Sequence, residues 1–291
     1  MKNKIIFISL FFALTLLAAT GLVLAENATA TTALTPHIEV VDPVNRVVEN
    51  GTVIELGAVG PGQTLELKFS RDSGALSVVN PQTGKNALWD KAEAINLPEG
   101  WVTRDSLLYE NPLTVFVTVS PSAREEDYLF SVKFTDEYEG LAPQIIRFKV
   151  RPTTEVVDVT LENPTLTTGV GQPAVYTFNI KSKSSASDTF TIRSSGLPYD
   201  WTFTKTILLP HNQEKKIVYE VVGNIQKDVS FSFDITSLSS ANIKRNVNAR
   251  VITVTSLLQD AKATSLGLPL FPSIEQNIYA LIGFVTNFLF G

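Results

Sequence analysis

One short motif occurs twice in this chain, and its surroundings recur with it. Leu97-Pro98-Glu99-Gly100-Trp101 returns as Leu197-Pro198-Tyr199-Asp200-Trp201. Each copy follows a turn that contains glycine and proline and then a segment of alternating apolar residues, and two further alternating segments come after it. Matching motifs in matching surroundings are the mark of a duplicated unit. The chain is therefore predicted to hold two copies of one domain.

Apolar and polar residues alternate through most of both copies, most clearly at 113–119, 128–134, 217–221 and 229–235. Alternation with a period of two puts one face of a strand on a core and the other in water. About seven short strands separated by turn residues favour an immunoglobulin-like β-sandwich for each copy. The one candidate for an amphipathic helix inside either copy is 87–95.

The composition suits this organisation, because 291 residues with 44% hydrophobic side chains and 17 phenylalanines can bury two cores. The chain contains no cysteine, which excludes disulfides, thiolate metal sites, cysteine nucleophiles and lipidation of an N-terminal cysteine. We expect an all-β protein of two tandem immunoglobulin-like β-sandwiches, at 38–152 and 153–256.

The N-terminus predicts export. Two lysines precede an unbroken apolar run that ends at Ala25, so 1–25 is interpreted as a signal peptide or, if it is not cleaved, a signal anchor. The Ala/Thr-rich composition that follows indicates a flexible spacer at 26–37. Asn27 and Asn50 begin sequons for glycosylation. The expected location is the cell surface, associated with the membrane.

The C-terminus predicts a linker at 257–272 and a hydrophobic, amphipathic helix at 273–291. Ser273 can cap that helix, with Gln276 three positions on. Its surface is mainly apolar with one narrow polar stripe, so it could span the membrane, lie on it, pack on a membrane protein or pack on its own sandwich. The residues expected to contact membrane are Leu281, Ile282, Val285, Phe288 and Leu289.

The three tryptophans carry different predictions. Trp101 and Trp201 follow the same proline turn, so both are expected to plug the space between sheets, in preference to a sugar-stacking role. From Phe69 to Leu97 is 97 − 69 = 28 positions, whereas the matching distance in the second copy is 197 − 178 = 19. The first copy thus carries about nine extra residues, and Trp89 lies among them. Trp89 is a candidate ligand contact, with covering of the sandwich edge as an equal alternative.

Few residues suit catalysis. His37 and His211 are the only histidines, and both are expected in solvated loops. The acidic clusters at 125–127 and 136–139 favour solvated turns over a calcium site or a pair of glycosidase carboxylates. We therefore predict no catalytic residue, no metal site and no cofactor, and we expect that the protein is not an enzyme.

Charge is divided unevenly between the copies. Residues 36–152 hold 17 acidic and 11 basic side chains, a net charge of −6, and residues 153–256 hold 9 and 10, a net charge of +1. An acidic first copy without a basic aromatic stripe argues against a nucleic acid partner.

The second copy resembles a known family. The resemblance is carried by the segment from Val170 to Ile180, by Ser187-Asp188-Thr189-Phe190, and by the second copy of the tryptophan motif. Together these are similar to the α-galactosidase-associated β-sandwich domain family, which recurs in tandem on archaeal and bacterial surface proteins. The match covers 156–254 well and 53–150 weakly. It implies a non-catalytic accessory module and supplies no catalytic residue.

These observations favour a non-catalytic cell-envelope protein whose sandwiches are binding or spacer modules displayed outside the cytoplasmic membrane. Its expected partners are membrane lipid or a membrane protein, through the C-terminal helix, and a cell-surface glycan or protein. The alternative is a carbohydrate-binding accessory subunit of a separate extracellular enzyme, and a glycoside hydrolase is a more distant one.

Overall fold

A computed structural model describes residues 35–202 and 204–255. The N-terminal segment, the sequon at Asn27 and the C-terminal helix predicted above lie outside the described residues. Within the described ranges, no helix has the length and apolar character needed to cross a membrane.

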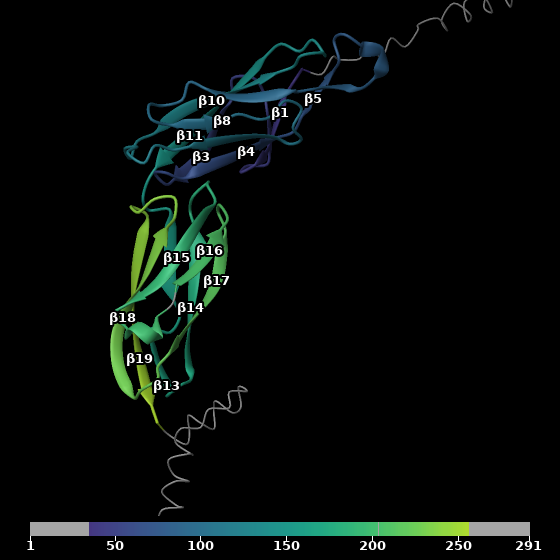
Figure 1. Ribbon diagram of the computed structural model, residues 1–291. Helices are drawn as coiled ribbons and strands as arrows, with labels where there is room; N and C mark the ends of the chain where they lie inside the picture. Colours follow the sequence, from purple (N-terminus) through teal and green to yellow (C-terminus); the bar gives the residue numbers. More distant parts are fainter. Residues whose placement is uncertain (1–34, 203, 256–291) are drawn as a thin grey trace, which may run out of the picture. The chain divides into compact units, whose positions relative to one another are not determined.

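The described chain is almost entirely β-strand, with two short 3-10 helices (Figure 1). The elements up to residue 152 are β1 (Ile38–Asp42), β2 (Arg46–Val48), β3 (Val53–Val59), β4 (Thr64–Phe69), β5 (Asp72–Leu76), η1 (Pro81–Thr83), β6 (Asn86–Leu88), β7 (Lys91–Ile95), β8 (Val102–Arg104), β9 (Leu113–Thr118), β10 (Tyr128–Thr135) and β11 (Gln144–Pro152). Those that follow are β12 (Val157–Leu161), β13 (Thr165–Gly169), β14 (Pro173–Ser182), β15 (Asp188–Ser195), η2 (Tyr199–Trp201), β16 (Thr204–Leu209), β17 (Glu214–Val222), β18 (Lys227–Ser237) and β19 (Lys244–Val254).

Both groups of strands form immunoglobulin-like β-sandwiches. The first pairs a five-stranded sheet, β2-β1-β4-β9-β8, with a four-stranded sheet, β3-β11-β10-β7. The second pairs β12-β14-β17 with β13-β19-β18-β15-β16. In each sandwich one strand lies parallel to the last strand of its unit, β3 beside β11 and β13 beside β19, and the other pairings are antiparallel. The predicted sandwich class is confirmed.

The two units differ in the strand that follows the tryptophan motif. In the first unit β8 joins β9, whereas in the second β16 joins β15 in the opposite sheet. The edge of β7 is occupied by side chains instead: the N–H of Ala92 donates to Ser106 Oγ at 2.8 Å, and that of Ala94 to Asp105 Oδ1 at 2.9 Å. A strand cannot add to an edge whose donors are already taken. In the first unit these contacts take the place that β16 occupies in the second unit.

The alternation read from the sequence corresponds to burial. Leu113, Val115 and Val117 of β9 are fully buried, and so are Phe233 and Ile235 of β18. In the second sandwich, the Phe233 ring lies within 4.8–5.2 Å of the rings of four aromatic residues. Those four are Tyr176, Phe178, Tyr219 and Phe231.

The repeated tryptophan motif makes the same turn twice. The N–H of Trp101 donates to the carbonyl of Pro98 at 3.2 Å, and that of Trp201 to the carbonyl of Pro198 at 3.0 Å. Both indoles are buried, Trp101 at 7% exposure and Trp201 at 3%. Their predicted role as core residues is confirmed.

Two predictions for the extra residues of the first unit are wrong. Residues 87–95 form strands β6 and β7 with a sharp connection, not an amphipathic helix. Trp89 is fully buried in the core, 6.2 Å from the Phe134 ring, and its Nε1 donates to the carbonyl of His37 at 3.0 Å. It therefore offers no ring to a ligand. The β5–β6 hairpin folds back and seats the indole inside the sandwich.

Candidate functional site: the tip of the first sandwich

Three loops meet at one end of the first sandwich, the end where β4 finishes at Phe69. They are the β5–β6 hairpin loop at 77–85, the loop before β9 at 105–112, and the loop between β10 and β11 at 136–143. The N–H of Val78 donates to the carbonyl of Glu139 at 2.8 Å, and the rings of Tyr109 and Tyr138 stack at 6.4 Å. Loops clustered at one end of a sandwich are a common place for binding residues, because a rigid scaffold positions them.

These loops expose large apolar side chains, which we call the tip surface. Tyr138 is 69% exposed and Leu107 is 74% exposed. The tip surface consists of Val78, Val79, Leu107, Leu108, Tyr109 and Tyr138. Singly scattered apolar residues are ordinary on a protein surface, whereas exposed apolar residues gathered on contacting loops are common at interaction sites.

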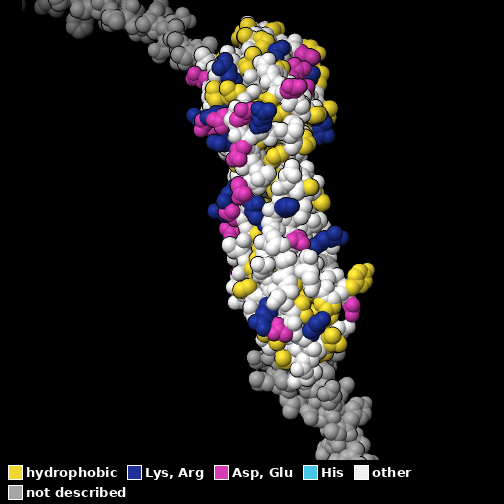
Figure 2. All heavy atoms as spheres, turned by 90° about the vertical axis from the view of Figure 1, so that its left-hand side faces the viewer, with side chains coloured by type: hydrophobic (Ala, Val, Ile, Leu, Met, Phe, Trp, Pro, Cys, Tyr) yellow, Lys and Arg dark blue, Asp and Glu magenta, His cyan; other side chains and the backbone are white. Residues whose placement is uncertain are grey.

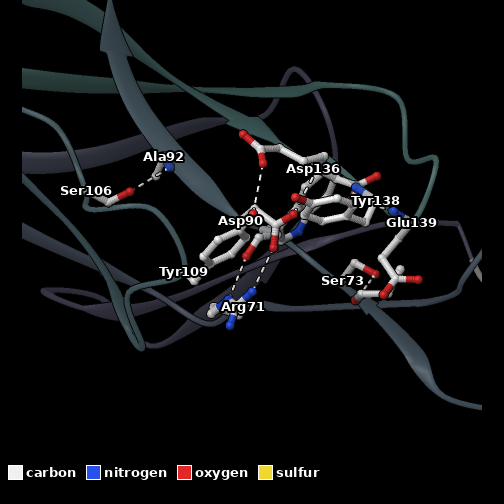
Figure 3. A network of polar contacts seen from close by, with 12 residues as sticks. Arg71, Ser73, Asp90, Ala92, Ser106, Tyr109, Asp136, Tyr138 and Glu139 are labelled. Atoms are coloured by element: carbon white, nitrogen blue, oxygen red, sulfur yellow. Dashed lines mark hydrogen bonds and ion pairs between the residues drawn. The ribbon is translucent and has the colours of Figure 1, made fainter.

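A buried carboxylate ties the loops together, as Figure 3 shows. Asp90, 4% exposed, accepts a hydrogen bond from Arg71 Nη2 at 2.7 Å and another from the N–H of Glu137 at 3.0 Å. Its carbonyl accepts the N–H of Tyr109 at 2.8 Å. Arg71 also donates through Nε to the carbonyl of Trp89 at 2.9 Å. One buried ion pair thus fixes two of the loops to the strands beneath them.

Tyr109 is held in an unfavourable backbone conformation. Its φ is +60°, a value that residues other than glycine rarely adopt and that costs about 1–3 kcal/mol. Three contacts hold its side chain: the hydroxyl donates to Glu137 Oε2 at 2.9 Å, the ring stacks on Tyr138, and the Arg71 guanidinium lies 5.6 Å from its centre. Hydrogen bonding with Tyr138 and Glu137 raises the pKa of Tyr109 above its usual value. A strained residue with this many contacts on an exposed loop is typical of a preformed binding surface.

Asp136 holds the loop at 136–143 in its conformation through hydrogen bonds to the loop's own backbone. Its carboxylate accepts the N–H groups of Tyr138, Glu139 and Leu141 at 2.8, 2.7 and 2.6 Å. The 136–139 cluster is therefore only partly a solvated turn, because its first carboxylate folds the loop that presents Tyr138. Among the described residues, no group of three or more His, Cys, Asp or Glu side chains is placed to hold a metal ion.

The tip is acidic. Its three loops contain five acidic residues and one basic residue, so their net charge is 1 − 5 = −4. The acidic residues are Asp105, Glu110, Asp136, Glu137 and Glu139, and the basic one is Lys85. On the face of the molecule drawn in Figure 2, basic and acidic side chains are interspersed and no broad basic area is visible.

The other residues singled out from the sequence lie apart from the tip loops or serve the fold. His37 and His211 lie in loops and are partly exposed, with His211 Nε2 3.3 Å from Asp42 Oδ1. In the 125–127 cluster, Asp127 pairs with Lys149 at 3.0 Å, and Asp127 together with Glu55 raises the pKa of that lysine. Asn50 is exposed in a turn, where its Oδ1 accepts the N–H of Ile145 at 2.8 Å.

Sequence reasoning did not find the tip surface. A signal for it exists in Leu107-Leu108-Tyr109, three consecutive apolar residues that break the alternation between Asp105 and Pro112. Such a run is usually avoided on an exposed loop unless it has a function. Its proximity to Tyr138 depends on folding.

Comparisons with known proteins identify no family. The chain matches no family model and no curated protein sequence. Among solved structures it is similar to a chimeric titin Z1Z2 carrying a peptide from decorin, at 8% identity over 76% of this chain and 99% of that chain, with a TM-score of 0.36. It is also similar to the adhesin InvE of Yersinia pseudotuberculosis, at 15% identity over 70% and 59% of the two chains, with a TM-score of 0.26. The fibronectin(III)-like modules of Clostridium thermocellum CbhA give 11% identity, 74% and 93% coverage, and a TM-score of 0.25. At these values the likenesses carry no argument about function.

Proposed function

We propose that this protein is a non-catalytic binding module of the cell envelope, and that the tip surface binds a protein partner outside the cytoplasmic membrane. The observation that carries the proposal is the strained, exposed Tyr109, held by Asp90, Arg71 and Glu137. Rigid aromatic side chains are effective interface residues, because little conformational entropy is lost when they are buried. The sandwiches supply the rigid scaffold that presents them.

The side chains of the tip indicate what kind of protein surface would bind there. Apolar and aromatic side chains lie at the centre, and the loops around them carry a net charge of −4. A complementary protein surface has an apolar centre and a basic rim. Association with such a partner weakens as salt is added, because exposed charges are screened.

The test is site-specific photocrosslinking from the full-length protein in native membranes. We expect a probe at Leu107 to trap a partner that a probe at Val102 does not. Val102 is 64% exposed but lies at the other end of the sandwich, since it pairs with Thr118, which faces Thr64 at the start of β4.

Substitutions measured on the purified pair complete the test. Leu107→Ser with Tyr138→Ser is expected to weaken binding at least about tenfold, whereas Val102→Ser leaves it unchanged. Equal trapping from both probe positions, or equal affinities of the two variants, would show that the tip is not the binding surface.

Export and membrane attachment belong to the same proposal and rest on the terminal segments. Burying Leu281, Ile282, Val285 and Phe288 in lipid would contribute roughly 1.5–3 kcal/mol each. In protein lacking residues 1–25, Ile282→Asp with Val285→Asp is expected to abolish sedimentation with liposomes and to leave the unfolding of both sandwiches unchanged. If the wild-type tail never sediments with lipid and the double variant destabilises the second sandwich, the helix packs on its own domain.

The absence of catalysis is likewise proposed. It is supported by the carboxylates of the two acidic clusters, of which Asp136 accepts three backbone N–H groups and Asp127 pairs with Lys149. A saturable hydrolase activity that disappears in Glu126→Gln or Asp136→Asn would overturn it. Membership of the α-galactosidase-associated family stays part of the proposal. The alternative of a carbohydrate-binding accessory subunit loses the support of Trp89, which is buried.

A further inference from the structure

The second sandwich exposes an aromatic ring of its own. Within the η2 turn Trp201 points into the core, so its neighbour Tyr199 points outward and is 93% exposed. The turn is held firmly from below: Trp201 Nε1 donates to Asn224 Oδ1 at 2.8 Å, and Asn224 Nδ2 donates to Asp200 Oδ2 at 2.9 Å. The core tryptophan thereby fixes the place of the exposed tyrosine.

A hollow of about 620 Å³ lies beside Tyr199. Its lining is polar apart from the tyrosine ring and comes from β15, the η2 turn, β16 and β18. The polar lining includes Arg193, Thr204 and Asp234. A concave site with one aromatic wall and several hydrogen-bonding groups suits a ligand that is amphipathic and rich in hydroxyl groups.

Those polar side chains form a straight row across the sheet. Thr204 lies opposite Arg193, Arg193 opposite Asp234, and Asp234 opposite Asn246 in the registers of β16, β15, β18 and β19. Arg193 Nε donates to Thr204 Oγ1 at 3.2 Å, and Asn246 Nδ2 donates to Asp234 Oδ1 at 2.6 Å. The neighbouring residues Ile192 and Phe233 are fully buried, so the row faces outward. It presents donors and acceptors in alternation on one plane.

A second hollow adjoins the first at the edge of the sandwich. It measures about 540 Å³ and shares Asp200 and Thr202 with the first hollow. Val218 and Val222 add an apolar strip, and both are partly exposed. Because Tyr219 and Val221 are fully buried, Val218 and Val222 face outward from β17, which belongs to the sheet opposite the row.

The charges select the class of ligand. Together the two hollows are lined by two basic and three acidic residues, so neither sign predominates. The basic residues are Arg193 and Lys205, and the acidic ones are Asp200, Glu220 and Asp234. A polyanion would meet the carboxylates and a polycation would meet the arginine and lysine.

We propose that the hollow beside Tyr199 binds a neutral oligosaccharide. One sugar ring stacks its C–H face on Tyr199, and its hydroxyl groups exchange hydrogen bonds with Arg193, Asp234 and Thr204. This site is independent of the tip surface and does not rest on the proposed protein partner.

The test uses full-length protein and six named probes: cellohexaose, laminarihexaose, xylohexaose, mannohexaose, chitohexaose and the acidic hexagalacturonic acid. Isothermal titration calorimetry is expected to detect binding of at least one of the five neutral probes and none of hexagalacturonic acid. Tyr199→Ser and Arg193→Gln should each weaken that binding at least about tenfold. Tyr138→Ser, at an exposed tyrosine of the other sandwich, is the matched control and should not change it.

The outcomes separate this site from the tip. Tyr199→Ser is expected to retain photocrosslinking from Leu107, and Tyr138→Ser is expected to retain saccharide binding. Far-ultraviolet circular dichroism and thermal unfolding check that both variants are folded, which their exposure favours. Failure of all five neutral probes, preference for the acidic probe, or binding that survives both Tyr199→Ser and Arg193→Gln would overturn the proposal.

Discussion

Replacing Trp201 by alanine is expected to lower the free energy of unfolding of the second sandwich by about 3–5 kcal/mol. The indole is 3% exposed, and its only polar atom is satisfied by Asn224. Gly223 packs directly against the ring, since a Cβ there would be 2.8 Å from it. Removal therefore leaves a cavity and an amide oxygen without its donor.

Denaturant unfolding is monitored by the hydrogen exchange of backbone amides in β18. The exchange of amides in β10 of the first sandwich serves as the internal reference. The matched control is Tyr199→Ala two residues earlier, which should change stability by less than about 0.5 kcal/mol because its ring is in solvent. A loss below about 1 kcal/mol for Trp201→Ala would contradict its place in the core.

The second large effect is expected for Asp90→Ala, at about 3 kcal/mol in the first sandwich. The substitution leaves Arg71 without its carboxylate and the N–H of Glu137 without its acceptor. The value lies at the lower end of the range for broken buried pairs, because the Arg71 side chain is 19% exposed and can reach water. Loss of the pair should also release the tip loops before the sandwich unfolds.

Two readouts distinguish the pair from general damage to the core. Hydrogen exchange at the amides of Tyr109 and Glu137 should accelerate more than exchange in β9. The double variant Arg71→Met with Asp90→Leu should recover a large part of the stability, because an apolar pair carries no desolvated charge, but it should not restore slow exchange at Glu137. Unchanged exchange at Glu137 in Asp90→Ala would show that this carboxylate does not hold the loop.

The sequence was sufficient to predict the elements that depend on interactions between residues close together in the chain. The alternation in 113–119 and 229–235 predicts strands with one buried face, since side chains in a strand point alternately to its two faces. The tryptophan motif predicts a turn followed by a buried indole, because proline restricts the backbone and the ring is too large to leave in water. Both copies behave in this way, with equivalent hydrogen bonds at Pro98 and Pro198.

The insertion in the first unit shows why position along the chain does not decide exposure. Trp89 lies among extra residues, and its neighbours do not distinguish a surface ring from a buried one. The hairpin closes over the core, and the carbonyl of His37, far away in sequence, accepts the indole N–H. Burial here depends on a contact between distant segments, which no local pattern records.

The sequence by itself determined the all-β class, the strands with the clearest alternation and the burial of Trp101 and Trp201, because these follow from periodicity and turn chemistry within a few residues. Only the tertiary structure decided that Leu107 and Tyr138 share a surface, that Asp90 holds it, and that Arg193, Asp234 and Thr204 form one row beside Tyr199. Strand register and the sheet that each edge strand joins set these neighbours, and both are fixed by pairing between distant segments. In the first unit two side-chain hydrogen bonds occupy donors on the edge of β7, and β8 pairs with β9 in the other sheet.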